Sequence, residues 1–98
     1  MNSKNLHILR EMAAKYIWWE TPDHAVSRPA RVVTQVMNIG DFEDVQRLVA
    51  CMGESSLRDI VQAAEAGQFN ARSWTYWHYR LGLAEPGGVP SLPVRKIQ

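Results

Sequence analysis

Residues 41–83, with the sequence DFEDVQRLVACMGESSLRDIVQAAEAGQFNARSWTYWHYRLGL, decide the fold of this chain. Gly53, Gly67 and Gly82 divide them into three short segments, and in each segment apolar residues recur at three- and four-residue spacing. This spacing is typical of amphipathic helices, and glycine is common just past a helix end. The stretch therefore predicts three consecutive helices, the last of which carries the aromatic run WTYWHY at 74–79.

Polar residues in front of each segment predict where these helices begin. The expected N-caps are Asp41 for the first segment, Ser55 or Ser56 for the second, with Asp59 completing a weak capping box, and Asn70 for the third. Each of these cap side chains offers an oxygen to a backbone N–H of the first helical turn. Glu43 and Asp44 follow the first cap, and the positive end of a helix accounts for both carboxylates.

Two further helices are expected before residue 41. Their apolar stripes are Leu6, Leu9, Ala13, Tyr16 and Ile17, after a Ser3 or Asn5 cap, and then Val32, Val33, Val36 and Ile39. The intervening stretch 18–24 is expected to be a connecting loop, because Pro22 disfavours helical geometry at the residue before it. The second helix is expected to follow a Ser27 cap, to hold Pro29 in its first turn and to end at Gly40.

The composition changes after Leu83. Residues 84–93 read AEPGGVPSLP, where three prolines and two glycines exclude a regular helix. No segment alternates apolar and polar residues with the period of a strand, and 98 residues suffice for one domain. The sequence therefore predicts an all-α fold, a compact bundle of about five short helices formed by residues 1–83, followed by an extended, Pro-rich C-terminal tail at 84–98.

The core is predicted from the positions that satisfy all the helical stripes together. Short connections between the segments imply that sequence neighbours pack against one another. The predicted core consists of Leu9, Val33, Val36, Phe42, Val45, Leu48, Val49, Leu57, Ile60, Val61, Trp74, Trp77 and Leu81.

Composition excludes several classes of protein. The net charge of +1 gives no general attraction to nucleic acid or acidic membranes. Cys51 is the only cysteine, which excludes an internal disulfide framework and favours a reducing compartment. The first residues lack the apolar core of a signal peptide, and no apolar run is long enough to cross a bilayer. We therefore expect a cytoplasmic protein without a membrane partner.

The sequence contains no recognisable set of reactive side chains. Cys51 flanks an apolar stripe and has no histidine or acid at a local spacing that would activate it, which is typical of a buried, inert thiol. His7, His24 and His78 are far apart, and no pair has the helical spacing of a metal site. We therefore expect no catalytic residues, no metal and no cofactor.

The aromatic run at 74–79 indicates a binding surface. Trp74 and Trp77 share a helical face with His78 and Leu81 and are expected to fill the core. Tyrosine and arginine outside that face are typical of protein interfaces, and a Pro-rich arm has little conformational entropy to lose on binding. The predicted partner-binding residues are Arg72, Tyr76, Tyr79 and Arg80 on the helix and Leu92, Val94, Arg95 and Lys96 in the tail.

DNA binding is an alternative interpretation. The segments around Gly53 and Gly67 could form a helix-turn-helix in which residues 70–80 are the reading helix. That helix carries only Arg72 and Arg80 as fixed cations. Any DNA binding is therefore expected to be weak and electrostatic.

A family resemblance covers roughly residues 18–83. It rests on Trp19-Glu20, on RVVTQVMNIGDFED at 31–44, on Gly53-Glu54, on LRDIV at 57–61, on RSWTYW at 72–77 and on LGL at 81–83. With these segments the chain resembles a family of small uncharacterised bacterial helical proteins. Ala71 stands where that family often has a proline in the first turn of its final helix.

Members of that family look like the companions, often encoded as neighbours, of nucleotidyltransferase-type toxins of the abortive-infection class. The resemblance implies that this chain is a non-catalytic antitoxin, which binds a cognate nucleotidyltransferase-like toxin and neutralises it by covering its surface. A small helix-turn-helix-like DNA-binding regulator is the alternative. The sequence leaves self-association open.

Overall fold

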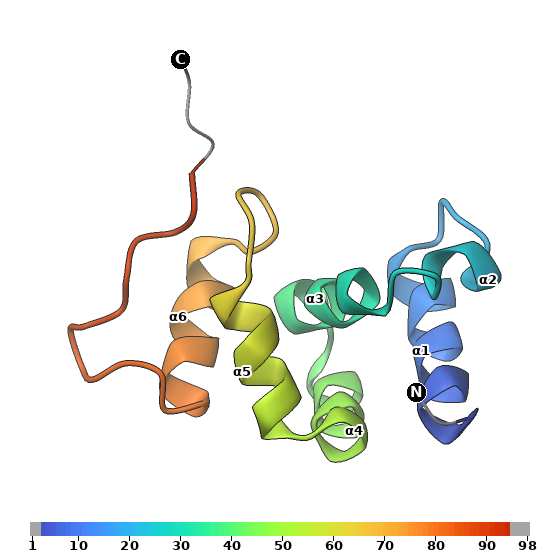
Figure 1. Ribbon diagram of the computed structural model, residues 1–98, viewed down its shortest axis with the longest axis horizontal. Helices are drawn as coiled ribbons and strands as arrows, with labels where there is room; N and C mark the ends of the chain where they lie inside the picture. The colour runs from blue at the N-terminus through green and yellow to red at the C-terminus, as the bar shows by residue number, and fades with distance from the viewer. Residues whose placement is uncertain (1–2, 95–98) are drawn as a thin grey trace.

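The computed structural model describes residues 3–94, with side chains from residue 5 onward, so the side chain of the expected Ser3 cap lies outside it. Its helices are α1 (Ser3–Tyr16), α2 (Pro22–Ala25), α3 (Pro29–Ile39), α4 (Phe42–Met52), α5 (Glu54–Gln62) and α6 (Ala71–Arg80). The described residues contain no strand (Figure 1). The predicted all-α class is confirmed, with six helices rather than about five.

The additional helix, α2, is a single turn in the stretch expected to be a loop. Thr21 is extended, with ψ of 147°, as steric contact with Pro22 favours. The Thr21 Oγ1 accepts a hydrogen bond from the His24 N–H at 3.2 Å. Pro22 occupies the first turn, where its missing N–H is not needed. Because the proline starts a helix here, the loop prediction is wrong for residues 22–24.

Two of the predicted helix caps are confirmed. Asp41 precedes α4, and its Oδ1 accepts a hydrogen bond from the Asp44 N–H at 2.8 Å. Asn70 precedes α6, and its Oδ1 accepts one from the Ser73 N–H at 2.8 Å. Both caps act within one turn of the chain, which is why local sequence is enough to predict them.

The predicted serine caps are wrong. Arg28 is the N-cap of α3 without a side-chain hydrogen bond, and Ser27 instead donates its hydroxyl to the His24 carbonyl at 2.6 Å. Gly53 is both the C-cap of α4 and the N-cap of α5, with φ of 80° and ψ of 151°. Ser55 and Ser56 therefore lie inside the first turn of α5 rather than in front of it.

The predicted end of α5 is wrong, and the predicted end of α6 is confirmed. The helix α5 ends at Gln62, and Gly67 lies in the turn that follows rather than at the helix end. The last helix, α6, ends as predicted next to Gly82, whose φ is 67°. The Leu83 N–H donates to the His78 carbonyl at 2.8 Å, and the Gly82 N–H donates to the Tyr79 carbonyl at 3.2 Å. These two bonds form a Schellman motif, which needs the left-handed conformation that glycine adopts easily.

The central helix of the bundle is α3, which contacts each of the other five helices. Figure 1 shows α1 and α2 on one side of α3 and α5 and α6 on the other. Val32, Val33 and Val36 on α3 are fully buried. A helix surrounded in this way must be apolar on more than one face, and the PARVVTQVMNI sequence of α3 meets that requirement.

Most of the predicted core is buried. The buried members are Leu9, Val33, Val36, Val45, Leu48, Leu57, Val61, Trp74, Trp77 and Leu81. Val49 and Ile60 are partly buried against this core. Ala13, Tyr16, Ile17 and Val32 from the two N-terminal stripes also belong to the core, as do Met12, Ala25, Met37 and Phe69, which the stripes did not single out. The Trp77 indole crosses to α3 and donates its Nε1–H to the Met37 carbonyl at 2.8 Å.

Phe42 and Ile39 are wrong predictions of burial. Phe42 is 75% exposed and Ile39 is 52% exposed. Phe42 is the first residue of α4, and helical side chains lean toward the N-terminus, so its ring lies beyond the neighbouring helix. Ile39 is the last residue of α3, at the corner where the chain turns away.

A buried carboxylate joins α1 to α4. The Asp44 Oδ2 accepts hydrogen bonds from the Tyr16 hydroxyl at 2.6 Å and from the Lys15 ammonium at 2.7 Å. Lys15 also reaches the Asp41 carboxylate at 2.8 Å. These bonds lower the pKa of Asp44, with Lys15 as the main cause, and they raise the pKa of Lys15. Asp44 therefore links two helices, a role that capping and the helix dipole alone do not describe.

Residues 84–94 contain no helix and run beside α6 (Figure 1). The Trp74 indole donates its Nε1–H to the Pro90 carbonyl at 2.7 Å. The Gly87 N–H donates to the Tyr79 hydroxyl at 3.2 Å. Val89 and Leu92 are partly buried against the core. This segment therefore packs on the same chain along the side of α6 that faces away from α3.

Candidate functional site

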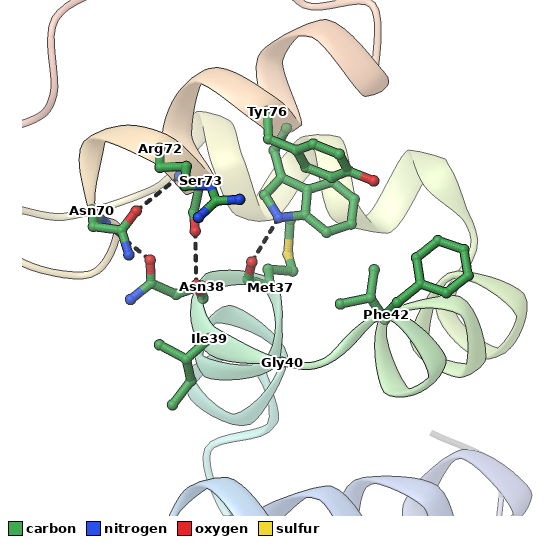
Figure 2. Close-up of a pocket in the computed structure, with 11 residues that line it drawn as sticks. Met37, Asn38, Ile39, Gly40, Phe42, Asn70, Arg72, Ser73 and Tyr76 are labelled. Atoms are coloured by element: carbon green, nitrogen blue, oxygen red, sulfur yellow. Dashed lines mark hydrogen bonds between the residues drawn. The ribbon is translucent and has the colours of Figure 1, made fainter.

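A groove of about 490 Å³ lies between the end of α3, the start of α4 and one face of α6 (Figure 2). Its lining residues come from three separate parts of the chain. They are Met37, Asn38, Ile39, Gly40, Phe42, Val45, Asn70, Arg72, Ser73, Tyr76 and Trp77. Two other hollows of the described residues are smaller, at about 430 and 280 Å³.

The apolar half of the groove has unusually exposed walls. Phe42 and Tyr76, which are 75% and 46% exposed, lie on the α4 and α6 sides of the groove, whereas Ile39 lies on the other side of the Gly40 corner with its side chain directed away from Tyr76 (Figure 2). Buried Val45 and Trp77 form the base. Exposed apolar side chains around a preformed hollow are characteristic of a binding surface.

Gly40 lies at the corner between Ile39, the last residue of α3, and Phe42, the first residue of α4 (Figure 2). A Cβ atom on Gly40 would lie 2.4 Å from the Val36 carbonyl oxygen and 2.9 Å from the Val36 Cγ1. Any other residue would therefore require the last turn of α3 or the connection to α4 to shift.

Hydrogen bonds fix the orientation of two amides at the polar end of the groove. The Asn38 Oδ1 accepts from the Asn70 N–H at 2.9 Å, and the Asn70 Oδ1 accepts from the Ser73 N–H at 2.8 Å. The Ser73 hydroxyl donates to the Asn38 carbonyl at 2.7 Å. Since both amide oxygens are used, the NH₂ groups of Asn38 and Asn70 are the groups left for an acceptor outside the described residues.

Arg72 lies at the same end of the groove (Figure 2). It is exposed, stands in the first turn of α6, and forms neither a hydrogen bond nor an ion pair with another described residue. By contrast, Arg31 pairs with Glu20 at 2.7 Å. The guanidinium of Arg72 has five N–H donors and no acceptor, so this end of the groove offers donors and positive charge.

The predicted partner-binding residues lie in different places. Arg72 and Tyr76 line the groove. Arg80 donates to the Tyr76 hydroxyl at 2.7 Å and lies over the Trp77 ring at 5.3 Å, so it supports the groove from the next turn. Tyr79 is half-exposed and contacts the C-terminal segment through Gly87.

The predicted tail residues are not part of the groove. Leu92 is partly buried against the core. Val94 is exposed, and Arg95 and Lys96 lie outside the described residues. The structure therefore brings Arg72, Tyr76 and Arg80 together and separates them from Leu92 and Val94.

Of the residues that line the groove, the sequence predicted only Arg72 and Tyr76 as partner-binding, and it missed Asn38, Ile39, Phe42 and Asn70 among others. Helical spacing assigned Ile39 and Phe42 to buried stripes, and Asn70 was interpreted only as a cap. A usable signal was present, because both apolar residues adjoin the Gly40 corner at helix ends, where side chains often escape burial.

The described residues show little sign of reactive chemistry elsewhere. Cys51 is half-buried, and its thiol contacts the Asn5 Oδ1 at 2.9 Å. No group of three or more His, Cys, Asp or Glu side chains among residues 3–94 is placed to hold a metal ion. Trp18 and Trp19 form an exposed edge-to-face pair with ring centroids 5.6 Å apart, outside the groove.

None of the helices in the described part of the chain has both the length and the apolar character to cross a lipid bilayer. No family model, no curated protein and no solved structure matches this chain. Functional assignment therefore depends on the geometry of the groove and on the resemblance noted in the sequence.

Proposed function

We propose that this protein is a non-catalytic protein-binding module and that the groove between α3, α4 and α6 is its docking surface. The observation that carries the proposal is the exposure of Ile39, Phe42 and Tyr76 around one hollow. These side chains gain nothing for the isolated fold by facing water, whereas a partner that covers them removes apolar area from solvent.

The partner that we propose is a cognate nucleotidyltransferase-like toxin, so that the protein acts as an antitoxin. The resemblance over residues 18–83 supports this choice, and most of the groove falls within its segments 31–44 and 72–77. Neutralisation by covering a surface requires shape and contact rather than a reactive group. A docking groove supplies both.

The Pro-rich tail is a second proposed contact. Val94 is exposed, and we propose that it meets the toxin together with Arg95 and Lys96, which lie outside the described residues and whose charge suits an acidic rim. A chain ending at Pro93 removes them and keeps the contacts of Pro90 and Leu92. We expect this truncation to weaken toxin binding at least about tenfold, measured by calorimetry. Equal affinity of the two chains would contradict the arm contact and leave the groove proposal standing.

Neutralisation by single-residue variants tests the groove. The protein is co-expressed with the nucleotidyltransferase encoded beside its gene, and growth and co-purification are measured. Phe42→Asp should abolish neutralisation and co-purification, because it removes the most exposed ring of the groove. At the first position of α4 an aspartate also suits the helix dipole, so the variant should remain folded.

Trp18→Asp is the matched control, since Trp18 is as exposed as Phe42, at 75%, but lies outside the groove. Its neutralisation should match that of the unmodified protein. Equal loss in both variants would reject the groove as the docking surface. The lack of any nucleotidyltransferase gene beside this one would count against the antitoxin assignment.

A DNA-binding regulator is the second candidate. Arg72 favours it, because the N-terminal residues of a recognition helix are the ones that contact base edges. Against it, residues 63–70 make a longer connection between α5 and α6 than the 3–4-residue turn of a helix-turn-helix. Arg80 is also engaged by Tyr76 and by Gln46 at 3.3 Å. Sequence-specific nanomolar DNA binding at physiological salt would place this function first.

A further inference from the structure

The polar end of the groove is suited to an anion. Arg72 and the NH₂ groups of Asn38 and Asn70 all lie there, and each is a donor without an acceptor among the described residues (Figure 2). Rotation of either asparagine amide would break the hydrogen bond that its Oδ1 accepts. The two amide donors are thus held in place before any partner arrives, which reduces the entropy that binding costs.

The other half of the groove is suited to an apolar side chain. Phe42 and Tyr76 lie on its two sides (Figure 2), and the buried Trp77 also lines the groove. An occupant that satisfies both halves must carry an apolar group and a carboxylate or phosphate on one face. Among the parts of a protein, an amphipathic segment with an aspartate or glutamate meets both conditions.

We infer that the groove binds an acidic amphipathic segment of the partner, with its carboxylate on Arg72 and the asparagine amides and its apolar side chains between Phe42 and Tyr76. This inference rests on the proposed protein-binding function and deepens it by naming the chemistry of the segment. Guanidinium and carboxylate form charge-assisted, often bidentate hydrogen bonds, which fix orientation as well as adding affinity.

Charge argues against two other occupants. Residues 86–98 of a second copy include Arg95 and Lys96 but neither Asp nor Glu, so in the groove they would bring like charge to Arg72. A nucleic acid would find one free cation in the groove and, next to Phe42, the exposed carboxylate of Glu43. Its phosphates would also leave the aliphatic side chain of Ile39 uncovered.

Peptide selection tests the inference. A random 12-residue peptide library displayed on phage is selected on the full chain, and peptides that also bind the Phe42→Asp variant are removed. The enriched peptides should combine Asp or Glu with Leu, Ile or Phe. Failure to enrich any peptide, or enrichment without an excess of acidic residues, would overturn the inference.

Affinity measurements on the best peptide then locate the carboxylate. By fluorescence anisotropy, replacing its acidic residue with the matching amide should weaken binding about tenfold, and Arg72→Glu should do the same. Arg28→Glu is the control, because Arg28 is also exposed, stands at a helix start and forms no side-chain contact within residues 3–94. It should change the affinity less than about twofold.

The outcomes separate this inference from the proposed function. Unchanged peptide affinity in Arg72→Glu would overturn the carboxylate assignment, while loss of toxin neutralisation in Phe42→Asp would still support the groove as the docking surface. Intact neutralisation in Phe42→Asp would reject the groove as the docking surface, and failure of the unmodified protein to neutralise the toxin would reject the antitoxin function itself. A 20-base-pair DNA duplex that displaces the peptide from the unmodified protein, and whose direct binding is weakened by Arg72→Glu and unaffected by Phe42→Asp, would overturn the inference in favour of nucleic acid.

Discussion

Arg72 stands where the isolated chain gains nothing from a positive charge. It lies in the first turn of α6, whose N-terminus carries a partial positive charge from the helix dipole. No carboxylate among the described residues compensates for this repulsion. A residue that disfavours its own helix and lines a groove is better explained by binding than by folding.

Replacing Arg72 with glutamate should therefore stabilise the free protein. We expect the free energy of unfolding to rise by about 0.3–1 kcal/mol, because a carboxylate complements the start of α6. Urea denaturation followed by circular dichroism measures the change, and Arg72→Gln should give an intermediate value. A clear loss of stability in Arg72→Glu would mean that the guanidinium contributes to the fold after all.

Asp44 differs from Arg72, because the charge of Asp44 stabilises the folded protein. The carboxyl is buried and accepts bonds from Tyr16 and Lys15, and its pKa is lowered below the ordinary value of 3.8. The unfolded state therefore takes up this proton at a higher pH than the folded state does. As the pH falls from the pKa of Asp44 in the unfolded state toward its lower pKa in the folded state, the free energy of unfolding must decrease.

Asp44→Asn should remove that dependence. At pH 7 we expect a loss of about 1–3 kcal/mol, since a charged acceptor of two hydrogen bonds is replaced by a neutral one. Between about pH 5 and pH 2 the variant should lose stability less steeply than the unmodified protein. Thermal melts across this range measure both effects. Glu43→Gln is the control, because Glu43 is the exposed neighbour, and identical slopes for Asp44→Asn and the unmodified protein would contradict the linkage.

At the scale of helices, Gly53 joins α4 to α5 without any intervening loop. Its N–H closes α4 on the Val49 carbonyl at 2.9 Å, and its φ of 80° with ψ of 151° sends the chain directly into α5. This backbone region is accessible to glycine almost alone. The angle between α4 and α5 therefore depends on one residue type at one position.

Gly53→Ala should lower the free energy of unfolding by about 1–3 kcal/mol. No atom lies within 4 Å of the added methyl group, so the cost comes from the backbone and not from a clash. Asparagine provides a matched comparison, since it tolerates the left-handed conformation of Gly82 but not the more extended one of Gly53. Chemical denaturation should therefore show Gly53→Asn to be less stable than Gly82→Asn, and the reverse order would contradict this account.

At the scale of the whole molecule, α6 separates two surfaces. One face lines the groove with Arg72 and Tyr76, and the other contacts residues 84–94 through Trp74 and Tyr79. Trp77 anchors α6 to the central helix α3. The groove is thus held by the core, while the C-terminal segment stabilises α6 from the far side.

A chain ending at Ala84 should remain helical but lose about 1–3 kcal/mol of stability. It lacks the Trp74–Pro90 hydrogen bond and the partial burial of Val89 and Leu92. A chain ending at Pro93 retains these contacts and should match the full-length protein. Urea denaturation of the three chains measures the difference, and equal stability of all three would show that the segment contributes nothing to the fold.

The sequence by itself determined the all-α class, the approximate positions of five helices, the caps at Asp41 and Asn70 and the buried face of α6. Capping bonds span three residues, and helical stripes repeat every three or four, so the physical cause of each lies within a short window of sequence. Arg72 and Tyr76 were predicted as partner-binding residues for the same reason, because both fall outside the stripe that contains Trp74 and Trp77.

Only the tertiary structure decided which apolar residues at helix ends are buried and which polar residues meet across helices. Phe42 and Ile39 have the spacing of core residues, but the neighbouring helices stop short of them. Asp44 meets Tyr16 across 28 positions, and Asn38 meets Asn70 across 32. Such contacts depend on how helices pack rather than on local periodicity. The groove between α3, α4 and α6 could therefore not be predicted from the sequence.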